Sequence, residues 1–354
     1  MLFGHNKQED AIGMIDKYPL MNDYWADKRV DMSKITIPAY VLASYSTALH
    51  TVGSFRGFEE LPSKEKWLRV HPTQEWHDLY SEACTEDLQR YFDCYLKGEQ
   101  NDWKQTPQIR ASLLRFNQDP IVNYVFSDWP IPDTDYRKLY LSGDAQLVHD
   151  LPRSSQTFSY QSDTPSLQID ADSEELHFSH KFTARSYLVG YSRAVLYVSC
   201  PNSDDLDVFI QLRKADASGK LLQNINIPLE HLELKAEEVA TVNTNKYLGP
   251  TGILRASHRK IDYEQSKPHW PLHSHFEEEK VPRGQVVELT IGLWPTGMAF
   301  EAGEQLVLKI AGHHMTLAEF EPLRGGFQTS NKGTHVVHVG PEHPSHVVVP
   351  FVSV

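Results

Sequence analysis

Apolar and polar residues along the first hundred positions alternate between two kinds of pattern. Short apolar runs at Ile35–Ala43 and Lys66–Val70 predict buried strands. Helices are predicted at Gln8–Ile15, Gly53–Leu61 and 82–97. The helix at 82–97 places its apolar residues on one face, namely Leu88, Tyr91, Phe92, Tyr95 and Leu96. Strands alternating with helices predict an α/β layer with a parallel sheet.

After about residue 105 the pattern changes to short strands separated by turns. Strands are predicted at Ile109–Phe116, Arg137–Leu141, Glu174–Phe182, Ala194–Cys200, Leu206–Arg213, Val286–Trp294, Gln305–Ile310 and Ser345–Phe351. Many short strands with turns between them are typical of an antiparallel sandwich or jelly roll. Residues 249–283 lack a strong period and are rich in His, Pro and charge, which predicts a long surface crossover.

Length and charge narrow the class of protein. A chain of 354 residues, 40% of them hydrophobic, is long enough for two domains with a core each. Lysine and arginine number 34 against 47 acidic residues, a net charge of −13, which argues against nucleic acid and against an anionic membrane surface. No apolar run reaches the length of a membrane span, and the first ten residues lack the apolar region of a signal peptide.

The cysteines favour a reducing compartment. The sequence contains Cys84, Cys94 and Cys200, an odd and sparse set that makes no disulfide framework. Cys84 and Cys94 lie ten residues apart in one predicted helix, roughly 15 Å along its axis, which is too far for a disulfide. We therefore expect a cytoplasmic protein.

A serine nucleophile is the first chemistry to look for. The nearest match to a G-x-S-x-G elbow is Gly190-Tyr191-Ser192-Arg193-Ala194. It lies between two runs that predict strands, whereas the elbow requires a turn from strand to helix. The sequence therefore indicates an ordinary strand serine at this position.

Histidine and aspartate clusters raise the alternative of a metal site. His273, His275 and Glu279 have the spacing of metal ligands, although a solvated loop explains them more simply. Asp204, Asp205 and Asp207 could bind calcium, but a charged turn before a strand is the more frequent reason for such a run.

A second pair of histidines, His313-His314, has no carboxylate at metal spacing and is expected on the surface or in a sheet. We predict no metal and no cofactor for this chain.

Several segments together resemble one family, the CocE/NonD serine hydrolases that carry an Xaa-Pro dipeptidyl-peptidase C-terminal domain. The segments that resemble this domain are Asp204–Phe209, Arg255–Arg259 with Pro271–His275, Leu293–Thr296 with Phe300–Gly303, and Gly340–His346 with Val349-Pro350. Upstream, Pro38–Ser44 and Trp67–His71 look like the hydrolase strands that lead to the acid and the base of the triad. Helix 82–97 looks like the last helix of that fold.

The resemblance implies a fold class of α/β plus all-β. Residues 1–105 would be the C-terminal portion of an α/β-hydrolase domain, and residues 106–354 a jelly-roll β-sandwich. α/β-Hydrolases place their triad in the order Ser, Asp, His, so the serine elbow is expected before Met1. The resemblance thus implies a missing N-terminal hydrolase segment.

Three residues match the positions of the acid and the base. Thr47 falls where the family has an aspartate, and a threonine cannot stabilise an imidazolium as a carboxylate does. His71 and His77 are alternative candidates for the single base, and ordinary loop histidines remain an equal interpretation of both.

Two functions from different classes follow. The first is hydrolysis of a small ester or an Xaa-Pro peptide through a serine acyl-enzyme, with the isolated chain inactive because the nucleophile lies elsewhere. The second is a non-catalytic jelly-roll binding module. Two parallel strands are too few for a stable sheet, so we expect residues 1–100 to pack partly against the jelly roll and to leave apolar surface exposed.

Overall fold

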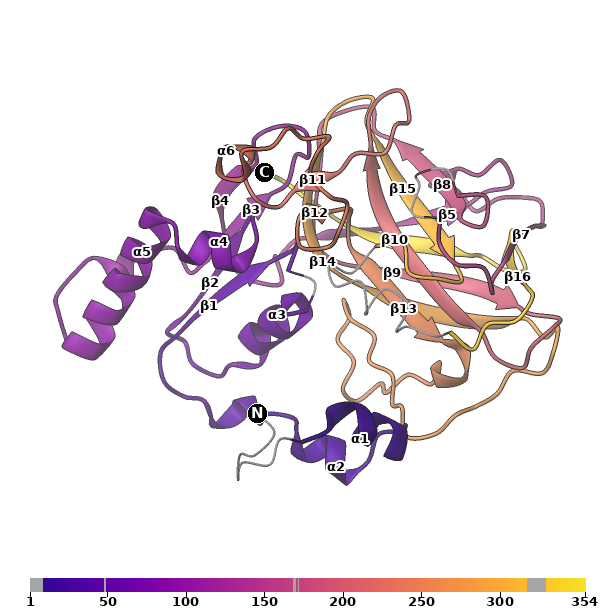
Figure 1. The fold of residues 1–354 in the computed structure, drawn as a ribbon, viewed down its shortest axis with the longest axis horizontal. Helices are drawn as coiled ribbons and strands as arrows, with labels where there is room; N and C mark the ends of the chain where they lie inside the picture. Colours follow the sequence, from indigo (N-terminus) through magenta and orange to yellow (C-terminus); the bar gives the residue numbers. More distant parts are fainter. Residues whose placement is uncertain (1–8, 48, 168–169, 171, 317–328) are drawn as a thin grey trace.

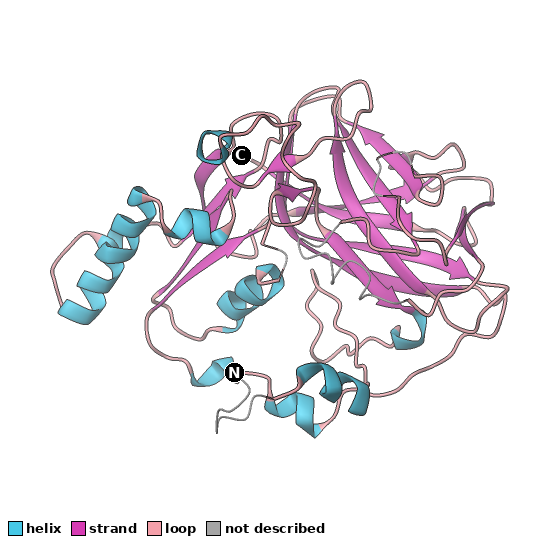
Figure 2. Cartoon of the chain, viewed as in Figure 1, coloured by secondary structure: helices cyan, strands magenta, loops and turns pink. Residues whose placement is uncertain are grey.

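The computed structural model describes residues 9–47, 49–167, 170, 172–316 and 329–354. Strands fill most of the molecule, and most of the helices belong to the N-terminal part (Figure 2). Among the described residues, no helix is both long and apolar enough to cross a membrane. All three cysteines carry free thiols, as expected from their number and spacing.

The N-terminal part is a small sheet with helices around it (Figure 1). Strand β1 pairs in parallel with β2, β2 pairs in parallel with β3, and β4 adds antiparallel to β3. The elements are α1 (Ala11–Lys17), α2 (Asp23–Asp27), η1 (Met32–Lys34), β1 (Ala39–Ser44), α3 (Thr51–Glu60), β2 (Lys66–His71), α4 (Glu75–Leu79), α5 (Glu82–Phe92), the π-helical turn η2 (Asp93–Lys97), η3 (Trp103–Gln105), β3 (Ile109–Leu113) and β4 (Ile121–Phe126).

The rest of the chain is a β-sandwich. One sheet has the order β13-β10-β15-β8, and the other runs β6-β5-β17-β9-β16-β7 with β14 paired to β9. A small pair, β11 with β12, stands apart. The elements are β5 (Asp135–Leu141), β6 (Leu147–Val148), β7 (Gln156–Gln161), β8 (Leu176–Lys181), β9 (Ser186–Ser199), β10 (Asp207–Ala215), β11 (Asn224–Ile225), α6 (Leu229–Leu232), β12 (Lys246–Tyr247), β13 (Thr251–Arg255), η4 (Ala256–His258), β14 (Val287–Phe300), β15 (Gln305–Ala311), β16 (Thr334–Val339) and β17 (His346–Val352).

Alternation along the long strands explains why the two sheets stack. In β14 the first residues alternate between buried and more exposed positions, as expected for a strand with one face in the core. One continuous hydrophobic core joins both sheets of the sandwich and extends into the small sheet, where Ala43, Phe55 and Leu68 belong to it. The N-terminal part therefore packs on the sandwich, as the sequence predicts.

The chain itself also connects the two parts. Directly after β3, the Leu114 amide donates to the Gly297 carbonyl (2.8 Å), and the Ala299 amide donates to the Leu114 carbonyl (3.0 Å). The residue that follows β3 is thus hydrogen-bonded directly to β14 of the sandwich. The expected boundary at residues 105/106 precedes β3, although β3 and β4 complete the N-terminal sheet.

Apolar surface is exposed in the N-terminal part, again as expected. The exposed large side chains there are Ile15, Val30, Ile37, Leu49, Trp76, Leu79, Tyr80, Phe92 and Leu96. Helix α5 shows the pattern well: Tyr91 packs with Trp67 and Trp103, while Phe92 and Leu96 of its apolar face are left uncovered. A face of this kind usually has a partner.

Three expectations need correction. The predicted crossover at 249–283 contains a strand, β13, which pairs with β10. The predicted helix at Gln8–Ile15 is observed at Ala11–Lys17, and Gln8 lies outside the described residues. Helix 82–97 changes to a π-helical turn at Asp93, so its last turn does not keep the apolar face in register.

Candidate active site

The carboxyl ends of β1 and β2 lie level with each other. The two strands run parallel from Ala39 opposite Lys66 to Ser44 opposite His71, so both end at the same edge of the sheet. Parallel sheets bind their ligands at this edge, because the loops that follow the strands converge there. Two of the three residues singled out from the sequence, Thr47 and His71, lie in this region.

His71 is the last residue of β2 and is almost completely buried, at 1% exposure. Its Nδ1 lies 3.0 Å from the carbonyl oxygen of Thr73. Because a carbonyl only accepts, Nδ1 carries the proton and Nε2 is left with its lone pair. Burial lowers the pKa of His71, and the nearby Asp78 carboxylate only partly opposes this effect. The side chain is therefore a neutral imidazole with one basic nitrogen.

Two serine hydroxyls lie beside His71 but are engaged elsewhere. Ser44 Oγ donates to the Thr73 carbonyl (2.8 Å), and Ser46 Oγ lies 3.0 Å from Ser44 Oγ. Among the described residues, no serine hydroxyl is hydrogen-bonded to His71. This edge of the sheet therefore holds a neutral histidine that could act as a general base, but none of the described serine hydroxyls is in contact with it.

In the described part of the chain, no carboxylate is hydrogen-bonded to His71 either. Thr47 Oγ1 is buried and has no hydrogen-bond partner among the described residues. Asp78 gives both carboxylate oxygens to Arg69, and Glu75 is paired with His50 Nδ1 at 2.9 Å. The Thr73 carbonyl thus takes the position at Nδ1 that a triad acid occupies in serine hydrolases.

His77 has different surroundings. It is half-buried on α4, and its ring lies 4.9 Å from the ring of His231 on α6. Burial lowers the pKa of His77, and the neighbouring His231 adds to the effect. The structure places only His71 at the end of a strand, and the choice between the two histidines as base stays a prediction.

A segment of the sandwich that the sequence did not single out covers this edge. The Gln74 amide donates to the Asn226 carbonyl (3.0 Å), and Gln74 Nε2 donates to the Thr244 carbonyl (2.9 Å). The region from β11 to β12 therefore closes over the loop that follows β2. The groups that accept hydrogen bonds from Gln74 are backbone carbonyls about 150 to 170 residues away in the sequence. Every residue type has such a carbonyl, so the sequence could not have revealed these contacts.

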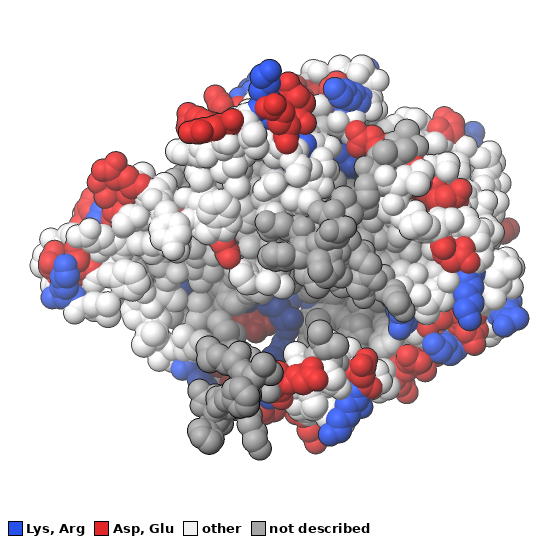
Figure 3. All heavy atoms as spheres, viewed as in Figure 1, with Lys and Arg blue, Asp and Glu red and all other residues white. Residues whose placement is uncertain are grey.

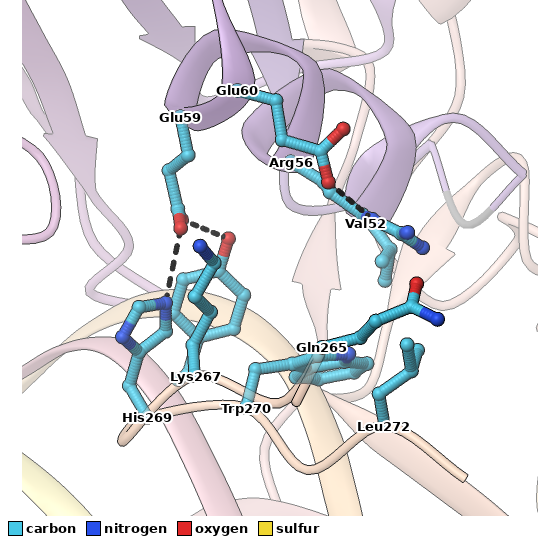
Figure 4. A pocket seen from close by; sticks show the side chains of 10 residues that line it. Val52, Arg56, Glu59, Glu60, Gln265, Lys267, His269, Trp270 and Leu272 are labelled. Carbon is cyan, nitrogen blue, oxygen red and sulfur yellow. Dashed lines mark hydrogen bonds and ion pairs between the residues drawn. The ribbon is translucent and has the colours of Figure 1, made fainter. Parts of the chain in front are cut away.

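Two cavities of the described part of the chain lie away from His71. One, of about 30 Å³, lies between α3 and the crossover, and Figure 4 shows the side chains that line it. Within it Glu59 accepts from the Tyr191 hydroxyl (2.6 Å) and from His269 Nε2 (3.0 Å). This space holds about one water, too little for a substrate. A second hollow, of about 410 Å³, lies beside Lys66 at the amino end of β2.

The other sequence candidates are accounted for by local structure. Ser192 is buried inside β9, so no turn from strand to helix follows it. The Glu279 carboxylate is paired with Arg259 (3.0 Å), and the His275 Nδ1 lies 3.0 Å from His258 Nδ1, so the histidine–glutamate set considered as an alternative is not assembled.

The acidic run before β10 consists of structural ion pairs. Asp205 binds Lys280 (2.8 Å), and Asp207 binds the guanidinium of Arg255 through both oxygens (2.7 and 2.9 Å). These ion pairs attach the segment 249–283 to the start of β10. The aspartates therefore have a structural role, as expected for a charged turn before a strand.

The fold defines the class of protein. A small, mostly parallel sheet with helices around it is joined to a large antiparallel β-sandwich, and the candidate site lies at the carboxyl ends of β1 and β2. Residues 101–348 match the family described as the X-Pro dipeptidyl-peptidase C-terminal non-catalytic domain. The chain therefore belongs to the family of this domain, and its resemblance to CocE/NonD family hydrolases is confirmed. A search of curated protein sequences found no match.

Solved structures agree with this assignment. A CocE/NonD family hydrolase from Staphylococcus aureus is 31% identical, with a TM-score of 0.85, and the match covers 97% of this chain and 59% of that one. An aminopeptidase from a marine sediment Thaumarchaeota archaeon (15% identity, TM-score 0.69) and an alpha-amino acid ester hydrolase (14%, 0.70) share the fold, each over 97% of this chain and 61% of theirs. This chain thus spans about three fifths of the length of these solved relatives.

Proposed function

We propose that this chain is the C-terminal part of a serine hydrolase that cleaves a small ester or an Xaa-Pro peptide through an acyl-enzyme. The observation that carries the proposal is the neutral, buried His71 at the carboxyl end of β2, in a chain 31% identical to a CocE/NonD hydrolase over 97% of its length. A histidine in this state accepts a proton from a serine as general base. The sandwich would be non-catalytic and would help to shape the site.

The nucleophile, in this proposal, comes from a segment that precedes Met1. Strand β1 ends the described sheet order on one side, so its outer edge is open to a further strand. Additional parallel strands placed there would bring their own carboxyl ends level with Ser44 and His71. A serine elbow on such a strand would meet His71, and the isolated chain would be inactive.

The surface in this region fits a site that a further segment completes. Leu49, in the loop between β1 and α3, is 84% exposed, and Trp76 and Tyr80 lie exposed near the end of β2. Their exposure is what we expect where a covering segment is lacking. Figure 3 shows acidic side chains over α5 and around α6, with basic side chains scattered among them, consistent with the net charge of −13.

The test is the intact mass of the native protein from its source, with and without a fluorophosphonate probe that labels active serines. We expect a species heavier than this chain that gains one probe mass. An unlabelled species with the mass of these 354 residues would contradict the proposal.

One observation favours a second candidate, a non-catalytic binding module. The Thr73 carbonyl lies at His71 Nδ1, and Thr47, which the family resemblance puts at the position of the acid, has no hydrogen-bond partner among the described residues. With Thr47 at that position, the triad would lack the carboxylate that stabilises the imidazolium. A heavier species that fails to react with the probe would favour this candidate. Substrate class and a cytoplasmic location stay predictions in either case.

A further inference from the structure

Three segments of the sandwich converge at one end of the sheet β13-β10-β15-β8. Strands β15 and β8 are antiparallel, and Ile310 at the end of β15 pairs with Leu176 at the start of β8. Residues that follow β15 and residues that precede β8 therefore meet at the same end. This register brings His313 to the carboxylates of Glu175 and Asp172, although about 140 residues separate them in the sequence.

The three side chains form a buried cluster of metal-ligating groups. One ligand atom from each lies within 4.8 Å of the other two, and all three residues are buried. His313 Nε2 is 3.3 Å from Glu175 Oε1 and 3.9 Å from Asp172 Oδ2. This corrects the expectation that His313 has no carboxylate near it and lies on a surface or in a sheet.

The imidazole of His313 is oriented by a backbone carbonyl. Its Nδ1 lies 3.1 Å from the carbonyl oxygen of Thr164, so Nδ1 carries a proton. In the neutral ring the lone pair of Nε2 is then directed at two carboxylates, which repel it. A cation must lie between these groups, either a proton on Nε2 or a metal ion. Histidines that bind metals usually have this arrangement, with the second nitrogen bonded to a carbonyl or carboxylate.

The charges nearby do not balance without such a cation. Lys309 contacts Glu175 and neutralises one carboxylate, and Arg213 is paired with Asp170 at 3.6 Å. With His177 and His313 uncharged, three carboxylates thus face two basic side chains.

The distances within the cluster fit a shared ion. The 3.3 Å contact between His313 Nε2 and Glu175 Oε1 also lies within hydrogen-bond reach, so a proton is the alternative that the experiment tests. A charge-assisted hydrogen bond from an imidazolium to a carboxylate is about 2.7–2.9 Å long. Ligands of a tetrahedral zinc, each about 2.0–2.2 Å from the metal, are about 3.4 Å apart. The separations of 3.3 and 3.9 Å are longer than such a hydrogen bond and close to the ligand spacing.

We propose that His313, Glu175 and Asp172 bind one divalent transition-metal ion, Zn²⁺ in the first place, at this end of the sandwich. One nitrogen and two carboxylate oxygens are a ligand set that zinc accepts, with a fourth position for water. The ion would hold the chain before β8 against the chain after β15, a structural role independent of the hydrolase proposal.

The experiment is zinc titration of the chain after treatment with EDTA, followed by calorimetry and by thermal unfolding. We expect one Zn²⁺ ion to bind tightly to each chain and to raise the Tm, because an ion that binds only the folded chain stabilises it. Co²⁺ bound in place of Zn²⁺ should give the visible absorption typical of a four-coordinate cobalt ion. His313→Gln should abolish the tight binding and the absorption. The matched control is His314→Gln, whose ring lies 4.7 Å from that of Phe209.

A second variant keeps the proposal testable if His313→Gln folds poorly. Lys309→Met removes the ammonium that competes for Glu175, so zinc should bind about tenfold more tightly. If the cluster is only a network of ion pairs with a protonated His313, Lys309→Met lowers stability and zinc binds neither protein tightly. That result, or equal binding to His313→Gln and His314→Gln, would overturn the proposal.

Discussion

His71 Nδ1 lies 3.0 Å from the carbonyl oxygen of Thr73, and this contact fixes which nitrogen of a buried histidine can act as a base. Loops after parallel strands often position catalytic groups, but here the orienting group is the backbone itself. A carbonyl holds the ring in place, as a triad carboxylate does. It stabilises a protonated ring less, because it carries no full charge.

The first prediction concerns the choice between His71 and His77. In the native protein that reacts with a fluorophosphonate, His71→Gln should slow labelling by about 10²- to 10⁴-fold, the contribution of a general base. His77→Gln is the matched control and should change the rate little, because His77 packs on His231 at a helix surface. The rate is measured from the intact mass over time.

If His77→Gln slows labelling and His71→Gln does not, the general base is His77. If both variants are labelled at the rate of the unaltered protein, neither histidine serves the serine, and this edge is not the active site.

The second prediction concerns two neighbouring glutamates on α3. Glu59 is nearly buried and accepts from Tyr191 and His269, so it joins α3 to the sandwich and the crossover. Glu59→Ala should lower the free energy of unfolding by about 2 kcal/mol, since hydrogen bonds to a charged group are lost. Glu60→Ala breaks a more exposed pair with Arg56 and should lower it by less than about 1 kcal/mol. Urea unfolding of both variants measures the difference.

Equal losses for the two variants would contradict this assignment. They would mean that Glu59 acts as an ordinary surface charge and that α3 is held by its apolar residues, such as Phe55, alone.

Most strands and the main helices could be predicted from the sequence, because each has a local signal. The run Lys66–Val70 is apolar and short, and β2 is found at Lys66–His71. β4, β7 and β16 were not predicted; in β7 three of six residues are exposed and only one is buried, so apolar alternation is weak. β13 lies in a stretch without a clear period and is held by its pairing with β10.

The candidate site, too, could be predicted from the sequence only where a residue has a local signal. His71 could be selected from the sequence because it follows a predicted strand, but the Thr73 carbonyl that orients it carries no signal of residue type. The contacts of Gln74 with Asn226 and Thr244 depend on how the sandwich folds back over the sheet. The group of Asp172, Glu175 and His313 forms through the register of β8 and β15, which local spacing does not encode.

The third prediction concerns the pH dependence of stability. His335 is fully buried beside Tyr160, and burial lowers the pKa of His335 from 6.5 to about 4. Between these values the unfolded chain binds a proton that the folded chain does not, so stability falls as the pH drops from 6.5 towards 4, by up to about 3 kcal/mol. His335→Gln should flatten this part of the profile, measured by urea unfolding from pH 7 to pH 4.5.

The control for that profile is His149→Gln, the same substitution at an exposed site. It should leave the slope unchanged. A His335→Gln protein with the full acid slope would show that other groups, and not His335, take up the proton on unfolding.

The last prediction concerns the junction between the two parts of the molecule. Lys214 on β10 is buried, and its Nζ donates to the carbonyls of Arg115 (3.0 Å) and Ala299 (2.8 Å) and pairs with Glu304 (2.7 Å). Arg115 lies just beyond β3, so this ammonium ties the N-terminal sheet to β14. Lys214→Ala removes the ammonium from two buried carbonyls and leaves the Glu304 carboxylate with only the backbone amide of Glu301.

The expected loss is about 3 kcal/mol in the free energy of unfolding, the size found when one member of a buried pair is removed. Lys220→Ala, at an exposed lysine of the turn after β10, should change stability by less than about 0.5 kcal/mol. Limited proteolysis should also cleave the Lys214→Ala chain near Arg115 faster, because the strand is no longer anchored there. An unfolding midpoint equal to that of Lys220→Ala would mean that backbone pairing between Leu114 and β14 holds the junction without the lysine.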